Sequence, residues 1–238
     1  MVRASATVTK QKNIIHFFTE VDVSLPLIII EKYKQKYREK LSFTGYLTKS
    51  LSNVILNYPS FNSFISGNRH VLLDEIIISV LVERKIGKDN IPEPMVLRDV
   101  AGKTIYEINT EIRKAQKVAK EKEEFGNLTN TRVFRFIPGF LLKTFVKLAD
   151  KNIKMGIKYG KICITSVGMF SKNPIWVIPH GSATVLLSVG SIIEKNKNKY
   201  LCLTVSFDHD IIDGAPAARF MNDLIEEIKS GKCIKDIA

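Results

Sequence analysis

The period of the apolar positions changes near the C-terminal end of the chain. In residues 201–207, apolar and small or polar side chains alternate, which predicts a strand with one buried face. From residue 215 to residue 230 the apolar positions recur at helical spacing, and Gly231 stands just past the end. Residues 208–214, with the sequence DHDIIDG, lie between these two segments. The pattern therefore places His209, flanked by carboxylates, where a strand passes into an amphipathic helix.

Strand and helix patterns follow one another less regularly in the rest of the chain. We expect strands at residues 14–23, 76–82, 161–165 and 183–189, a hairpin over 61–73, and helices at 27–37, 44–56, 104–122 and 137–154. Ser42 or Thr44 is suited to cap the helix at 44–56, and Thr104 with Glu107 has the pattern of a capping box. The intermixed elements lack regular strand–helix–strand alternation, which indicates an α/β fold with a mixed β-sheet covered by helices.

Two prolines interrupt the pattern between the predicted strand at 76–82 and the apolar residues 95–97. Pro92 and Pro94 cannot donate backbone hydrogen bonds, so we expect residues 87–94 to form a turn and then an extended segment. No linker rich in glycine, serine or proline divides the 238 residues, and a single domain over residues 1–238 is expected.

Composition excludes several classes of protein. The longest apolar runs, residues 25–30 and 76–82, are far shorter than the roughly 18 residues of a membrane span. The polar start does not resemble a signal peptide, so we expect a cytoplasmic protein with no membrane partner. Three cysteines without CxxC or Cys/His spacing predict neither a disulfide framework nor a metal site.

The formal net charge is +12, and lysine contributes more of it than arginine. In the predicted helix 137–154, a lysine stripe recurs at helical spacing: Lys143, Lys147, Lys151 and Lys154. Such a stripe suits an anionic ligand, an anionic partner or a membrane surface, but a plain solvated helix face is the simpler explanation. Basic blocks interleaved with aromatic residues are absent, as are zinc-finger spacing and RNA-binding motifs, so no nucleic-acid partner is predicted.

His209 is the centre of the candidate chemistry. Imidazole is suited to general-base catalysis because its ordinary pKa lies nearest neutrality. Three other readings of residues 208–213 remain open on the residues alone. They are a structural histidine beside a helix cap, a metal site made by His209 and the aspartates, and a hydrolase triad in which Ser166 or Ser182 is the nucleophile.

The segment around His209 resembles the DHRVIDG…AARF signature of the 2-oxoacid dehydrogenase acyltransferases, a family related to chloramphenicol acetyltransferase. Residues 20–23 resemble the EVDV strand of that family, and residues 164–170 resemble its TISN(L/V)G turn. Further similarities cover residues 41–44, 58–62, 82–84, 96–99 and 185–190, so the resemblance extends over nearly the whole chain.

The resemblance implies the chloramphenicol acetyltransferase-like fold and CoA-dependent acyl transfer to a thiol such as dihydrolipoamide. It implies that His209 is the general base, that Thr165 donates a hydrogen bond to the tetrahedral oxyanion, and that Asp213 is a structural residue held in a charge pair, with Arg3 as a candidate partner. Ser166 and Gly168 would contact coenzyme A. Members are homotrimers or multiples of trimers, with His209 of one subunit facing Thr165 of its neighbour.

The chain also departs from the family pattern. Asp210 replaces the arginine that follows the histidine, which puts a carboxylate beside the base and is expected to oppose the binding of anionic CoA. Residues 131–159 replace a segment that is shorter in the family. The length of the chain also leaves no room for the lipoyl and partner-binding domains of complex components, so we expect any lipoyl group to belong to a separate protein. A trimer that keeps the fold as a non-catalytic binding or scaffolding module is the alternative to an enzyme.

Overall fold

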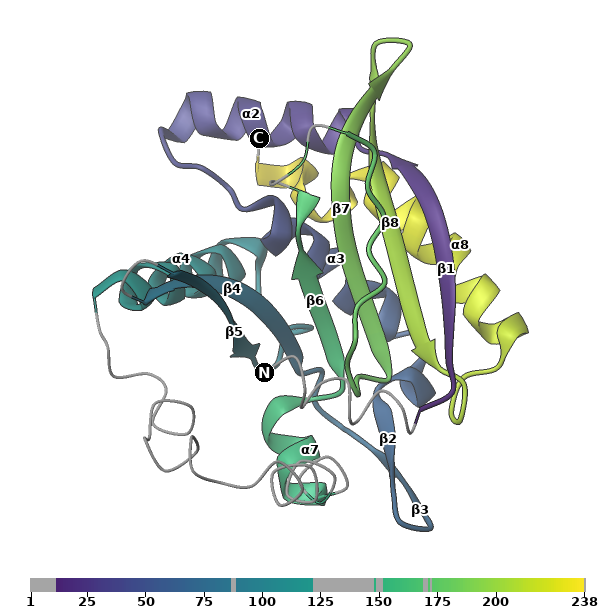
Figure 1. The fold of residues 1–238 in the computed structure, drawn as a ribbon. Helices are drawn as coiled ribbons and strands as arrows, with labels where there is room; N and C mark the ends of the chain where they lie inside the picture. Colours follow the sequence, from purple (N-terminus) through teal and green to yellow (C-terminus); the bar gives the residue numbers. More distant parts are fainter. Residues whose placement is uncertain are drawn as a thin grey trace.

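The centre of the molecule is a six-stranded mixed sheet in the order β1-β8-β7-β6-β4-β5 (Figure 1). The computed structural model describes residues 12–86, 89–121, 148, 152–168, 171 and 173–237. The strands are β1 Ile14–Asp22, β4 Ile78–Ile86, β5 Asp89–Leu97, β6 Ile162–Ser166, β7 Val185–Lys195 and β8 Asn198–Asp208. Strand β6 pairs in parallel with β4 and β7, and the other pairs are antiparallel. The predicted mixed sheet is confirmed.

Helices cover one face of this sheet (Figure 1). They are α2 Ser24–Tyr37, α3 Phe43–Ile55, α4 Ile105–Glu121 and α8 Gly214–Ser230. Smaller elements are α7 Ile153–Tyr159, the 3-10 helices η1 Pro59–Phe61 and η3 Lys232–Ile237, and the hairpin of β2 Ser63–Ser66 with β3 Arg69–Leu72. In the described ranges, no helix has both the length and the apolarity that crossing a membrane requires. Most of the predicted helix 137–154, with three of the four lysines of its stripe, lies outside the described residues.

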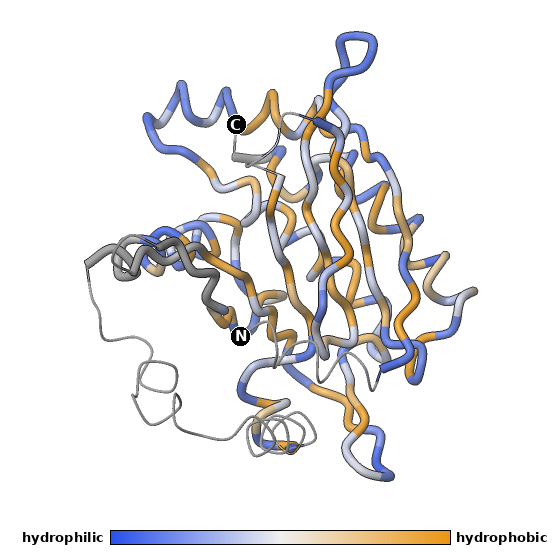
Figure 2. Tube along the Cα trace, viewed as in Figure 1, coloured by the Kyte–Doolittle hydropathy of each residue, from blue (hydrophilic) through white to orange (hydrophobic). Residues whose placement is uncertain are grey.

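The core lies between the sheet and these helices. Phe207 of β8, Phe220 of α8 and Phe61 of η1 are at most 2% exposed, and the rings of Phe61 and Phe220 stack with centroids 4.8 Å apart. Figure 2 shows the hydrophobic residues concentrated along the strands, whereas the tip of the β7–β8 hairpin is hydrophilic. Burial of this apolar surface is the main force that fixes α8 against the sheet.

Local sequence signals fix several helix ends as predicted. The Ser42 hydroxyl accepts a hydrogen bond from the Gly45 amide at 3.2 Å and caps α3. The Glu107 amide donates to the Thr104 hydroxyl at 3.3 Å, and the Thr104 amide donates to the Glu107 carboxylate at 2.8 Å, which completes the capping box of α4. Gly231 ends α8 with a φ of 60°, a left-handed conformation that glycine adopts at little cost.

The extended conformation predicted for the proline segment is confirmed, and residues 89–94 are paired within the sheet although Pro92 and Pro94 donate no backbone hydrogen bonds. Residues 87 and 88, where the turn is expected, lie outside the described residues. Pro92 pairs with Glu83, and Pro94 pairs with Leu81, within the β4–β5 ladder. Strand β5 lies at the edge of the sheet. Pro92 and Pro94 are two residues apart, so their missing amide donors fall on the same side of the strand, and an edge strand has one side that needs no partner.

The second face of the sheet is also covered in part, which corrects the prediction that β8 is buried on one face only. Cys202, Thr204 and Ser206 point away from the helices, yet they are at most 4% exposed. Residues 173–183, here called the strap, cross this face in front of β7 (Figure 1). The Ile175 amide donates to the Ser191 hydroxyl at 2.9 Å and fixes the strap to β7. Periodicity within β8 could not reveal this cover, because a distant segment supplies it.

A half-buried histidine on the strap side of the sheet makes stability depend on pH. His16 Nδ1 lies 2.8 Å from the Ser206 hydroxyl, and burial together with the neighbouring His180 lowers the pKa of His16 below its ordinary value of 6.5. The folded state therefore binds this proton more weakly than the unfolded chain, and the stability that neutral His16 contributes is lost as the pH falls from about 6.5 through the folded-state pKa. We expect the thermal unfolding midpoint of the wild type to fall more than that of His16→Gln over this range. If the unfolding midpoints of the wild type and of His16→Gln changed equally with pH, the lowered pKa assigned to His16 would be contradicted.

Candidate active site

His209 lies in the short turn that joins β8 to α8. Its side chain is 42% exposed, and its backbone amide donates to the Asn13 carbonyl at 2.6 Å. Asp213 occupies the N-cap position of α8, where its carboxylate accepts from the Gly214 amide at 2.7 Å. One oxygen of Asp213 is 3.8 Å from His209 Nε2. The turn thus holds the backbone of His209 while it leaves the imidazole accessible.

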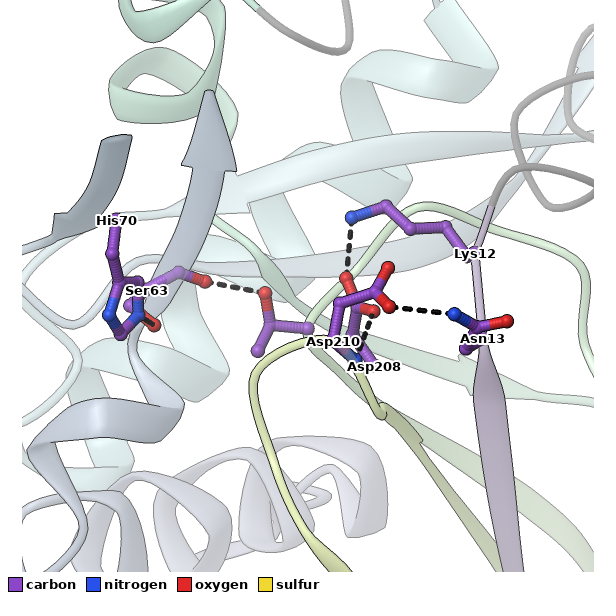
Figure 3. A network of polar contacts seen from close by, with 7 residues as sticks. Lys12, Asn13, Ser63, His70, Asp208 and Asp210 are labelled. Atoms are coloured by element: carbon purple, nitrogen blue, oxygen red, sulfur yellow. Dashed lines mark hydrogen bonds and ion pairs between the residues drawn. The ribbon is translucent and has the colours of Figure 1, made fainter. Parts of the chain in front are cut away.

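Two residues that precede β1 hold this turn (Figure 3). The Lys12 ammonium donates to the carboxylate of Asp208 at 2.5 Å, and the side chain of Asp208 is only 1% exposed. The Asn13 side-chain amide donates to Asp210 at 2.7 Å, and the Asp210 amide donates to Asp208 at 3.2 Å. A buried carboxylate is costly unless it is paired and hydrogen-bonded, and both conditions are met here. We call Lys12, Asn13, Asp208 and Asp210 the turn clamp.

The described residues show one buried ion pair in this turn, between Lys12 and Asp208. Among these residues, no lysine or arginine pairs with Asp213, whose side chain is 82% exposed. Arg3, the candidate partner for Asp213, lies outside the described residues. Lys12 and Asn13 are not predicted from the sequence, where their only signal is their position directly before the first predicted strand.

Thr165 lies on β6, half-buried and far from the His209 of its own chain. It is paired with Ser188 of β7, and Ser188 is paired with Thr204 of β8, four residues before Asp208. Strand geometry then separates Thr165 from the end of β8 by about 13 Å along the strands and about 10 Å across them. Figure 1 shows the carboxyl ends of β6 and β8 at opposite ends of the sheet. One subunit does not bring Thr165 and His209 together.

Ser166 and Gly168 follow Thr165 closely. Ser166 ends β6 opposite Val189, and the Val167 amide donates to the Val189 carbonyl at 3.0 Å. A β-carbon added to Gly168 would lie 1.7 Å from the Gly190 carbonyl oxygen. Close backbone packing against β7 therefore explains the glycine. Contact of Ser166 and Gly168 with CoA remains a prediction.

The metal and hydrolase readings find little support in this geometry. The described part of the chain contains no group of three or more His, Cys, Asp or Glu residues that could hold a metal ion. Asp208 and Asp210 are bound to Lys12 and Asn13 instead. Among the described residues, no serine hydroxyl makes a hydrogen bond to His209. General-base chemistry on an incoming substrate is the role that an accessible, backbone-anchored imidazole supports best.

The fold is that of the chloramphenicol acetyltransferase-like proteins. A chloramphenicol acetyltransferase structure superposes with a TM-score of 0.57 at 14% identity and covers 97% of this chain and 93% of its own. The truncated catalytic core of the 2-oxoacid dehydrogenase multienzyme complex from Thermoplasma acidophilum superposes with a TM-score of 0.72 at 23% identity, over 97% of this chain and 94% of that one. The chain belongs to the family described as 2-oxoacid dehydrogenases acyltransferase (catalytic domain), which it matches over residues 3–129 and 149–233.

Curated relatives are components of dehydrogenase complexes. The dihydrolipoyllysine-residue succinyltransferase component of the 2-oxoglutarate dehydrogenase complex of Staphylococcus saprophyticus is 24% identical over 228 residues, which cover 90% of this chain and 46% of the relative. The corresponding acetyltransferase component of the pyruvate dehydrogenase complex of Haemophilus influenzae is 26% identical over 193 residues, or 80% of this chain and 30% of the relative. The chain thus spans less than half the length of these two proteins.

Proposed function

We propose that the protein is a CoA-dependent acyltransferase that moves an acyl group between CoA and a thiol such as dihydrolipoamide. The acceptor thiol attacks the thioester carbonyl of acyl-CoA, the carbon–sulfur bond to CoA breaks, and a new thioester and free CoA are formed. The observation that carries the proposal is the turn of His209, where an accessible imidazole stands on a backbone fixed by Asn13 and by the buried Lys12–Asp208 pair. The family membership supports the same reaction.

His209 acts as the general base in this proposal. It takes the proton of the attacking thiol, and the imidazolium returns a proton to the departing CoA thiolate, so that no acyl-enzyme is formed. A positioned acid–base group typically accelerates such a reaction by about 10²–10⁴-fold. Asp213 keeps a structural role in this proposal, because it is the N-cap residue of α8, where its carboxylate accepts from the Gly214 amide.

Thr165 donates its hydroxyl hydrogen bond to the oxyanion of the tetrahedral intermediate. A donor of this kind is typically worth about 3 kcal/mol of transition-state stabilisation. Because Thr165 is distant from His209 within one chain, we assign the two residues of one site to neighbouring subunits. A cyclic homotrimer repeats such a heterologous contact three times and closes on itself.

Exposed apolar side chains on the strap side of the sheet support this assembly. Phe18 of β1 is 53% exposed, and Trp176 and Ile178 of the strap are 36% and 51% exposed. The Trp176 indole donates to the Thr19 carbonyl at 3.2 Å, which ties the strap to β1. Burial of this apolar surface against a second copy would favour association.

Ser166 and Gly168, next to Thr165, are assigned to the CoA side of the site. The acceptor would be a lipoyl group, by analogy with relatives named as dihydrolipoyllysine acyltransferases. Asp210, which replaces the arginine of the family signature, accepts a hydrogen bond from Asn13 at 2.7 Å. It therefore acts as part of the turn clamp rather than as a contact to CoA.

The direct test uses the purified chain with acetyl-, succinyl- and branched-chain acyl-CoA and with dihydrolipoamide as acceptor. Chromatography should detect S-acyl-dihydrolipoamide and free CoA in equal amounts. A trimer that forms neither product with any acyl-CoA, and does not bind CoA in calorimetry, would overturn the proposal and favour the non-catalytic scaffold.

A further inference from the structure

Three hydroxyl side chains form a row across the strap side of the sheet. Thr165 of β6 is the register partner of Ser188 of β7, and Ser188 is the partner of Thr204 of β8. Residues directly opposite one another on neighbouring strands point to the same face, with their β-carbons about 5 Å apart. Ser188 therefore stands beside Thr165 on one side and beside Thr204 on the other.

Two members of this row are buried without a partner. Ser188 and Thr204 are 0% exposed, and neither hydroxyl makes a hydrogen bond within the described residues. A buried hydroxyl without a hydrogen bond is unfavourable, and such groups are rare in folded proteins. An alanine at residue 188 would avoid this cost, so the serine hydroxyl needs another explanation.

The chemistry assigned to Thr165 supplies that explanation. A threonine hydroxyl has one proton to donate and two lone pairs with which to accept. When Thr165 donates its proton to an oxyanion, its lone pairs remain available to a neighbouring donor. Rotation about the Cα–Cβ bond of Ser188 lets its hydroxyl point along the row toward Thr165 Oγ1.

We propose that Ser188 is a positioning residue that donates its hydroxyl proton to Thr165 Oγ1, directly or through one buried water, and so aims the Thr165 hydroxyl at the oxyanion. The inference rests on the proposed acyltransferase function. Donation to Thr165 Oγ1 fixes the rotamer of Thr165 and polarises its O–H bond, since hydrogen bonds in a chain strengthen one another. Because Ser188 is fully buried, the proposal has it act through Thr165 and not by direct contact with the substrate.

The test is a pair of double-mutant cycles on kcat, measured with acyl-CoA and dihydrolipoamide. Ser188→Ala should lower kcat about fivefold to tenfold, within the range of one hydrogen bond, and leave KM for acyl-CoA unchanged. In a Thr165→Val background, Ser188→Ala should have no further effect, because the group it positions is gone. The matched control is Thr204→Val, which removes the other buried hydroxyl of the row; it should leave kcat unchanged, and Ser188→Ala should retain its full effect in that background.

A second readout does not depend on turnover. Thermal unfolding at fixed protein concentration should show Ser188→Ala lowering Tm by about 2–4 °C in the wild type and by much less in Thr165→Val. Any of three results would overturn the inference. They are a Ser188→Ala variant with wild-type kcat, coupling of Ser188 to Thr204 in place of Thr165, and a Tm of Ser188→Ala that equals or exceeds that of the wild type. If the wild type transfers no acyl group, the proposed function fails, and the Tm cycle still decides whether Ser188 and Thr165 are bonded.

Discussion

Replacing His209 with alanine is expected to lower kcat for acyl transfer by about 10²–10⁴-fold. The reason is that the attacking thiol loses the base that takes its proton. Because the side chain is 42% exposed and the turn is held through the backbone, the variant should fold and assemble as the wild type does. The measurement is the initial rate of S-acyl-dihydrolipoamide formation, with the assembly state followed by light scattering.

His70→Ala provides a control histidine. His70 is also exposed, but its Nε2 lies 2.7 Å from the buried Ser63 hydroxyl on the β2–β3 hairpin, and the proposed mechanism gives it no role. Its removal should leave kcat unchanged. A His209→Ala protein that assembles and retains wild-type kcat would show that another group supplies the base.

Replacing Lys12 with methionine is expected to lower the free energy of unfolding by about 3–5 kcal/mol. The substitution leaves the carboxylate of Asp208, only 1% exposed, without its charge partner. Because Asp208 directly precedes His209, kcat should fall as well. Urea unfolding at a fixed protein concentration measures the stability change, since the stability of an oligomer depends on concentration.

Lys195→Met is the matched control for this experiment. Lys195 pairs with Glu20 at the same 2.5 Å distance, but the two side chains are 50% and 29% exposed. Exposed pairs contribute roughly 0–1 kcal/mol, so this loss should be small. Adding Asp208→Asn to Lys12→Met should recover part of the stability, because the uncompensated charge disappears. Equal losses for Lys12→Met and Lys195→Met would contradict the role assigned to the buried pair.

The sequence predicted the elements whose signals are local. The helical spacing after Gly214, the cap at Ser42 and the capping box at Thr104 each depend on residues a few positions apart, and the structure contains all three. The cover over the polar face of β8 could not be predicted in this way, because the strap comes from a different part of the chain. Pairing of the proline strand likewise depends on its place at the sheet edge, which is a property of the whole topology.

The residues of the site show the same difference between local and long-range signals. His209 could be found from the sequence because the change from strand to helix periodicity marks its turn. Lys12 could not be found in this way, because it contacts Asp208, 196 positions away in the sequence, and no local pattern predicts that contact. The separation of Thr165 from His209 follows only from the register of β6, β7 and β8.

The central claim is that one site takes His209 from one subunit and Thr165 from the next. Mixing His209→Ala and Thr165→Val subunits by joint unfolding and refolding tests it, because each variant supplies the residue that the other lacks. After random mixing, roughly three of every four trimers contain both variants. Each mixed trimer has one intact site among its three, so about a quarter of wild-type activity should return. The same proteins combined without subunit exchange should stay inactive. Refolded mixtures that contain mixed trimers and yet are no more active than their separate components would contradict a site shared between subunits.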